Sequence, residues 1–224
     1  MPPDRRSRPR VSKGALIEFR DGLGGIIERV VVFQYNPEKM TRKLFTLTGD
    51  TDTGTQAANQ PSSERQASTA PVETINLTLE LDATDQLEHP SEHPMVVERG
   101  VLPTLSAIEM MMYPERHSTI ELSMERATSE RTKSTRQPTV LFICGNSRIM
   151  PVRLTKLSII EEAFDTNLNP IRAKVELEMK VLSDTEMEKN TLGYNAYLGY
   201  IANKRFLSQA FRYLRTRKEN INIY

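Results

Sequence analysis

The chain has 224 residues, and its 30 lysines and arginines almost balance its 29 aspartates and glutamates, which leaves a formal net charge of +1. A balance this close to neutrality argues against a general nucleic-acid-binding protein, although local basic patches are compatible with it. No apolar run approaches the roughly 20 residues that a membrane helix needs, and the basic N-terminus lacks the apolar core of a signal peptide, so neither is predicted.

The N-terminal segment is predicted to be a disordered basic arm over residues 1–12, because four arginines and three prolines accompany almost no apolar side chains. It is either a solvated tail or an electrostatic tether to a partner. Two predicted strands follow, Gly14–Arg20 and Ile26–Phe33, joined by Asp21–Gly25. This glycine-rich segment lacks the Gly-Lys-Ser/Thr ending of a phosphate loop and is predicted to be a hairpin turn. The apolar run Val30–Phe33 predicts burial on both faces of its strand.

A strand break is predicted at Asn36 and Pro37, because proline fixes φ and has no backbone N–H to donate. Strand-like alternation resumes over Met40–Leu47. The polar stretch Thr48–Pro71 is longer than an ordinary loop, and it either orders against a neighbouring subunit or is a flexible insertion. Strict alternation over Val72–Asp82 then predicts a strand with one buried face.

The middle of the chain first gathers carboxylates and two histidines over Asp82–Pro94. His89 and His93 each precede a proline, so they do not present the ligand spacing of a helix face, and a solvated acidic loop is preferred to a metal site. The three- and four-residue spacing of apolar side chains over Val101–Tyr113 predicts a helix, packed on the core or forming a methionine-rich binding surface. Alternation returns over Ser118–Met124.

The region from residue 139 to 182 is predicted to be the spine of an antiparallel sheet. Val140–Cys144 is apolar throughout and predicts a strand covered on both faces, in which the chain's single cysteine is a small buried side chain without a disulfide partner. In Val152–Ile160 the apolar phase slips, which predicts a bulge near Lys156. Asp165–Pro170 is a turn, and Ala173–Val181 alternates strictly between apolar and charged residues.

Residues 184–224 are predicted to form a helical extension, because aromatic and aliphatic side chains that include Tyr197 and Phe211 recur at helical spacing. Basic residues such as Arg215 gather toward its end, which gives a basic amphipathic helix. Its apolar stripe would be an aggregation hazard if exposed, so one face is expected to dock. This face packs either on the chain's own sheet or on a partner protein.

The order of these features resembles the tube-like domain of contractile injection systems. An apolar strand ends in glycine, a second strand ends in an aromatic and an acidic residue, and a turn with proline, arginine and alanine leads into the last strand. These positions are Gly145, Phe164, Asp165, Pro170, Arg172 and Ala173. The resemblance extends upstream to FQYNPEKM (residues 33–40) and INLTLELDATD (residues 75–85), and it covers roughly residues 14–183.

The resemblance implies a mainly β (α+β) fold over residues 13–183, a tail-tube-like antiparallel β-barrel or sandwich with one packed helix, followed by the helical extension. It implies a structural baseplate and tube-adaptor protein of a phage tail-like particle that assembles in the cytoplasm. Six copies would form a ring that joins the inner tube and the spike or hub protein to the baseplate wedge proteins, with no cofactor, nucleic acid or membrane insertion. Longer relatives carry a LysM module after this domain, and no LysM pattern is found here, so the extension is expected to replace that module as a clamp on the baseplate. The expected assembly residues are Asn36, Pro37, Asp165, Pro170, Arg172, Tyr197, Phe211 and Arg215.

Two alternatives remain. The first is that the chain is the inner tube protein of the same particle, although a long extension does not suit the minimal contour of a stacked subunit. A carbohydrate-binding sandwich would need exposed aromatic residues on a sheet face, and the long strands show almost none. No catalytic constellation or phosphate loop is found, so an enzyme is not predicted.

Overall fold

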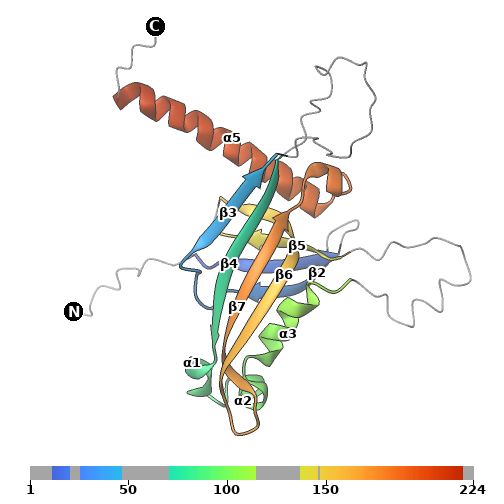
Figure 1. Ribbon diagram of the computed structural model, residues 1–224, viewed down its shortest axis with the longest axis vertical. Helices are drawn as coiled ribbons and strands as arrows, with labels where there is room; N and C mark the ends of the chain where they lie inside the picture. Colours follow the sequence, from blue (N-terminus) through green and yellow to red (C-terminus); the bar gives the residue numbers. More distant parts are fainter. Residues whose placement is uncertain (1–11, 21–25, 47–70, 115–136, 146, 219–224) are drawn as a thin grey trace, which may run out of the picture.

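The computed structural model describes residues 12–20, 26–46, 71–114, 137–145 and 147–218. Seven strands form one antiparallel sheet with the order β2-β1-β5-β6-β7-β4-β3 (Figure 1). They are β1 (Ala15–Arg20), β2 (Ile26–Val32), β3 (Met40–Phe45), β4 (Val72–Asp82), β5 (Thr139–Ile143), β6 (Ile149–Phe164) and β7 (Pro170–Val181). The helices are α1 (Thr84–Leu87), α2 (Pro94–Arg99), α3 (Leu102–Met110) and α5 (Leu192–Lys218), with a 3-10 turn η1 (Asp184–Glu186). The predicted mainly β class is confirmed.

The sheet is strongly curled, so that β1, β2 and β5 cross the direction of the long strands β4, β6 and β7 (Figure 1). The 16-residue strand β6 connects the two parts, because it pairs with β5 at its start and with β7 along the rest. The side-chain amide of Gln34 bridges the curl at one end. It donates to the carbonyl oxygen of Asp82 at 2.6 Å and accepts from the N–H of Asp82 at 2.9 Å.

The described strands do not close into the expected barrel or sandwich. β2 and β3 are the two edges of the sheet and do not pair with each other. Gln34, just after β2, bonds the backbone of Asp82 at the end of β4 through its side chain, and no backbone ladder joins these two segments among the described residues. The described part of the fold is therefore an open, curled sheet.

The core lies on the inward face of the curl. β4 and β7 bury alternate residues as predicted, and Leu177 of β7 pairs with Leu77 of β4. The predicted helix is confirmed as α3, which buries Leu105 and Ile108 against this core. The predicted bulge is also confirmed, since the β6–β7 register shifts between Leu154 and Lys156, where the apolar phase slips.

β5 is buried on both faces, as its continuous apolar run predicts. Its inward side chains, including Phe142, join the core, while Leu141 and Ile143 face the first half of α5. Cys144 was expected inside this strand, but β5 ends at Ile143 and Cys144 is only half-buried. The prediction of a fully buried cysteine is therefore wrong.

Two other predictions need correction. Val30–Phe33 was expected to be buried on both faces, yet Val30 is 52% and Val32 is 55% exposed, because β2 is an edge strand whose outward face lacks a covering layer among the described residues. Asp82–Pro94 was expected to be a loop, but it contains α1. Asp82, which ends β4 just before this helix, accepts hydrogen bonds from the N–H and the hydroxyl of Thr84.

Several predictions concern residues outside the described part of the chain. These are the arm up to residue 11, the turn Asp21–Gly25, nearly all of Thr48–Pro71 and the strand Ser118–Met124. They stay predictions.

Candidate assembly surfaces

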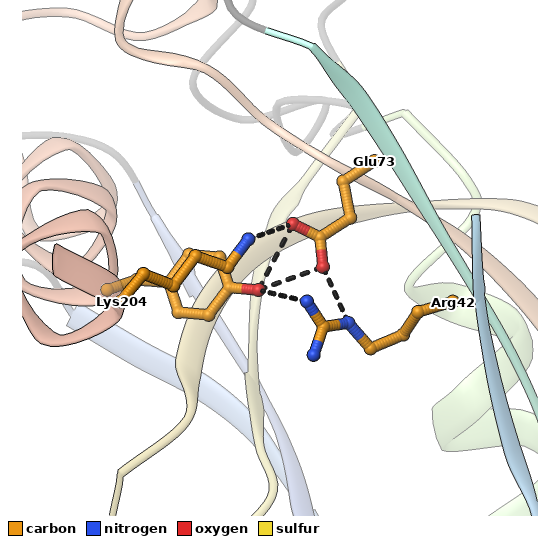
Figure 2. A network of polar contacts seen from close by, with 4 residues as sticks. Arg42, Glu73 and Lys204 are labelled. Carbon is orange, nitrogen blue, oxygen red and sulfur yellow. Dashed lines mark hydrogen bonds and ion pairs between the residues drawn. The ribbon is translucent and has the colours of Figure 1, made fainter. Parts of the chain in front are cut away.

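α5 is fixed to the edge of the sheet by a buried carboxylate, Glu73 of β4 (Figure 2). Tyr200 donates its hydroxyl to Glu73 Oε1 at 2.8 Å, and Lys204 Nζ, one helical turn further on, donates to Glu73 Oε2 at 2.6 Å. From β3, Arg42 Nε donates to Glu73 Oε1 at 2.8 Å. Lys204 also lies 4.2 Å from the ring centroid of Tyr200. One carboxylate thus joins two strands and a helix.

The charges of this network favour an ionised Glu73. Burial alone would raise the pKa of Glu73, but the hydrogen bonds from Lys204 and Tyr200, together with the charges of Lys204 and Arg42, lower the pKa below its usual value. Burial and the hydrogen bond to Glu73 raise the pKa of Tyr200, so its hydroxyl keeps its proton and remains a donor. Glu73 is 5% and Tyr200 is 4% exposed, which makes the contact part of the folded core.

The two halves of α5 differ in their surroundings. The first half lies against the outward face of β5 and the start of β6, and Ala196 and Gly199 line a groove between the helix and the sheet. Asn203 donates to the carbonyl oxygen of Ser147 at 2.6 Å. The second half runs away from the sheet (Figure 1), and its Phe206 and Phe211 side chains are 66% and 62% exposed. The extension therefore combines an anchored half with a projecting half.

The turn between β6 and β7 is built around Asp165. This carboxylate accepts hydrogen bonds from the N–H groups of Asn167 and Asn169 at 2.7 and 2.8 Å, and from the side-chain amide of Asn169 at 2.9 Å. The bonds from Asn169 and Asn167 lower the pKa of Asp165. The turn predicted over Asp165–Pro170 is confirmed.

This turn packs against the junction between α2 and α3. The carbonyl oxygen of Pro170 accepts from the N–H of Val101 at 2.9 Å, and Gly100 adopts φ +56° beside it. Arg172, two residues on, pairs with Asp82 of β4 at 2.8 Å. Pro170 and Arg172 therefore have defined contacts within the chain, and their expected role in assembly stays a prediction.

Asn36 fixes the corner between β2 and β3. Its side-chain oxygen accepts from the N–H of Gly14 at 3.1 Å, and its amide donates to the carbonyl oxygen of Ser12 at 3.0 Å. Pro37 lies next to it in the connection. The corner predicted at Asn36 and Pro37 is present, and its described contacts tie the start of β1 to the β2–β3 connection.

The eight expected assembly residues do not form a single site. Asn36 and Pro37 lie at the corner, while Asp165, Pro170 and Arg172 belong to the β6–β7 hairpin. Tyr197 is half-buried in the anchored half of α5, and Phe211 is exposed in the projecting half. The side chain of Arg215 lies outside the described part of the structure.

The sequence reasoning missed the Glu73 network, although one signal was present. Glu73 lies on the same face of β4 as the buried residues Ile75 and Leu77, because alternate residues of a strand share a face. A carboxylate therefore occupies a core position of β4. A charge at such a position needs partners. Tyr200 lies 127 residues away in the chain, and no local pattern identifies it.

Other kinds of site find little support in the described residues. Their histidines, cysteine and acidic residues form no group of three that could hold a metal ion. None of the described helices combines the length and apolar character needed to cross a membrane.

Within the described residues, the curled antiparallel sheet has β2 and β3 as its edge strands, and the second half of α5 projects from it. The sequence pattern of the family described as contractile injection system tube protein matches residues 24–190. The match covers most of the chain, from just before β2 to just before α5. The chain belongs to this family, and it is a structural tube-like component. A comparison with curated protein sequences gave no match.

Proposed function

We propose that the chain is the tube-adaptor component of a contractile injection system. Six copies form a closed ring that continues the inner tube and joins it and the spike to the baseplate. The observation that carries this proposal is the match of the tube protein family over residues 24–190, together with the two edge strands of the described sheet. Unpaired edges are a liability for an isolated subunit, and contacts around a closed ring protect them.

The projecting half of α5 distinguishes the adaptor from the inner tube protein, which is the second candidate. Phe206 and Phe211 are exposed on a helix that leaves the body of the subunit. Exposed aromatic residues of this kind mark a surface for protein contacts. A subunit stacked many times along a tube needs a minimal repeating outline, which this helix interrupts. The inner tube protein is supported by the description of the family itself.

The proposed partners are other copies of the chain, the inner tube protein, the spike or hub protein and baseplate wedge proteins. The particle would assemble in the cytoplasm of the producing cell. In this function the chain is a structural protein that needs no cofactor and no catalytic residue. Asn36 and the Asp165–Arg172 hairpin would hold its contact surfaces in place through the hydrogen bonds described above.

The mass of the purified protein in solution tests the ring. Six chains of 25.5 kDa give about 153 kDa, which light scattering coupled to size-exclusion chromatography distinguishes from a monomer. Negative-stain images of the same fractions should show rings with sixfold symmetry. A monomer at the highest accessible concentration, combined with the absence of such a ring from assembled particles, would refute the proposal.

A further inference from the structure

One side of α5 carries an apolar stripe in both halves of the helix. Side chains three, four or seven residues apart lie on the same side of a helix. Leu207 and Phe211 therefore share the side of Ala196 and Tyr200, which contact the chain's own sheet, with the polar Asn203 and Lys204 in the turn between the two pairs. Leu207 and Phe211 are 54% and 62% exposed, and neither belongs to the described core. The stripe therefore continues past the surface that its first half covers.

A matching apolar surface lies on the outward face of β2, β1, β5 and β6. The strand register places two rows of residues across these four strands, Val30–Ile17–Leu141–Pro151 and Val32–Ala15–Ile143–Ile149. All eight side chains are apolar. At the β5 and β6 end the first half of α5 covers the rows and leaves a groove of ≈ 540 Å³, whereas at the β2 end Val30 and Val32 are more than half exposed.

These two surfaces lie at opposite edges of the sheet. Lys204, at the start of the projecting half, is held next to Arg42 of the edge strand β3, while Val30 and Val32 belong to the other edge strand, β2. A subunit with different complementary surfaces at its two sides forms head-to-tail contacts, which close into a ring when the rotation permits.

We propose that the second half of α5 of one copy packs on the outward face of β2 and β1 of the next copy. The inference rests on the ring proposed above and assigns the interface that holds it together. The occupant is a second copy because the chain's own α5 already shows that this face accepts this stripe. Ala196 and Tyr200 pack at one end of the rows, and Leu207 and Phe211 offer the same four-residue spacing to the uncovered end.

The charges around the two surfaces agree with this contact. Glu28 lies two residues before Val30 in β2, at the bulge where the register with β1 shifts between Ile27 and Arg29. The projecting half of α5 carries Arg205, which is exposed, and four more basic residues follow by residue 218. Opposite charges on β2 and on the projecting half of α5 favour the contact.

Cross-linking between two different single-cysteine variants tests the proposal directly. Both variants carry Cys144→Ser; one also carries Val32→Cys and the other Phe211→Cys, at positions that are 55% and 62% exposed. A bifunctional maleimide added to the mixture should join one chain of each kind. The control replaces Val32→Cys by Leu168→Cys, which is 78% exposed on the β6–β7 turn and far from the proposed contact. Equal yields from the two mixtures, or attachment of the position-211 variant to a baseplate subunit instead in assembled particles, would overturn the inference.

A second set of variants separates this contact from the ring itself. Leu207→Gln with Phe211→Gln, and Val30→Thr with Val32→Thr, each should weaken self-association at least about tenfold in sedimentation. Their combination should add little, because both pairs remove the same contact. Circular dichroism should show an unchanged fold, since all four side chains are exposed. Normal rings from both double variants would refute the helix contact and leave the proposed function standing. A wild-type chain that forms no ring in solution or in particles would refute the proposed function as well.

Discussion

Replacing Glu73 by glutamine tests the anchoring of α5. Glutamine keeps the size of the side chain and one acceptor oxygen, but it removes the charge that faces Arg42 and Lys204. Breaking a fully buried ion pair costs roughly 3–5 kcal/mol. Here the side chains of Arg42 and Lys204 are 31% and 34% exposed, so water solvates both cations after the change. We therefore expect a loss of about 2 kcal/mol in the free energy of unfolding.

The assay is urea denaturation of both proteins at one fixed protein concentration, because self-association would otherwise shift the apparent stability. Glu98→Gln is the matched control. Glu98 pairs with Arg99 on the surface, where the two side chains are 66% and 59% exposed, so its loss should cost less than about 0.5 kcal/mol. Amide hydrogen exchange should also accelerate in the first half of α5 in the Glu73 variant alone.

The same variant makes a prediction about pH. The folded state lowers the pKa of Glu73 below its ordinary value of 4.5, so the ionised carboxylate stabilises the fold above that pH. This contribution is lost as the pH falls through the lower, folded-state pKa. The stability difference between wild type and Glu73→Gln should therefore be constant near neutrality and shrink in acid. A difference below 0.5 kcal/mol at pH 7, or one that does not change in acid, would refute the reasoning.

Further predictions concern the backbone and the extension. Gly100→Ala should lower the free energy of unfolding in urea by about 2 kcal/mol or more, because φ is +56° and the added Cβ would lie 2.1 Å from the carbonyl oxygen of Pro170. Gly145→Ala should lower it by only about 1 kcal/mol, because φ is +72° but the added Cβ would meet no atom within 4 Å. Equal losses for the two would contradict this account. A chain that ends at residue 183 should aggregate on expression, because it lacks Tyr200 and Lys204 and leaves β5 uncovered. A chain that ends at residue 205 keeps both side chains, so it should remain soluble and folded but form weaker rings.

The contacts of α5 distinguish two roles that the sequence leaves open for the extension. From the sequence, the helical region either folds back on the chain's own sheet or clamps a partner. The described contacts place the first half of α5 on the chain's own sheet, since Tyr200 is buried against Glu73. A clamp on baseplate subunits stays a prediction for the projecting half, and it is the alternative to the contact with a neighbouring copy proposed above. The boundary at residue 184 also stays a prediction.

Strand periodicity made much of the sheet predictable. The bounds of β4 agree with the sequence prediction, and the slip of phase in β6 gave the position of its bulge, because both patterns are set by residues close together in the chain. The exposure of Val30 and Val32 could not be predicted in the same way. It depends on β2 being at the edge of the sheet, which is decided by pairing between distant segments.

The candidate surfaces were less predictable than the strands. The spacing of Tyr197 and Phe211 correctly indicated a helix, but not which turns would be covered. Coverage depends on where Glu73 holds the helix, through partners that come from β3 and α5. The sequence shows a carboxylate in a buried phase, and only the tertiary structure identifies the groups that neutralise it.

Cryo-electron microscopy of intact particles tests the central claim most directly. The account predicts six copies of this chain in one ring between the inner tube and the spike, with the projecting half of α5 on the neighbouring copy. Many stacked rings along the particle would instead identify the inner tube protein. The absence of any ring of this chain from the particle would contradict the account.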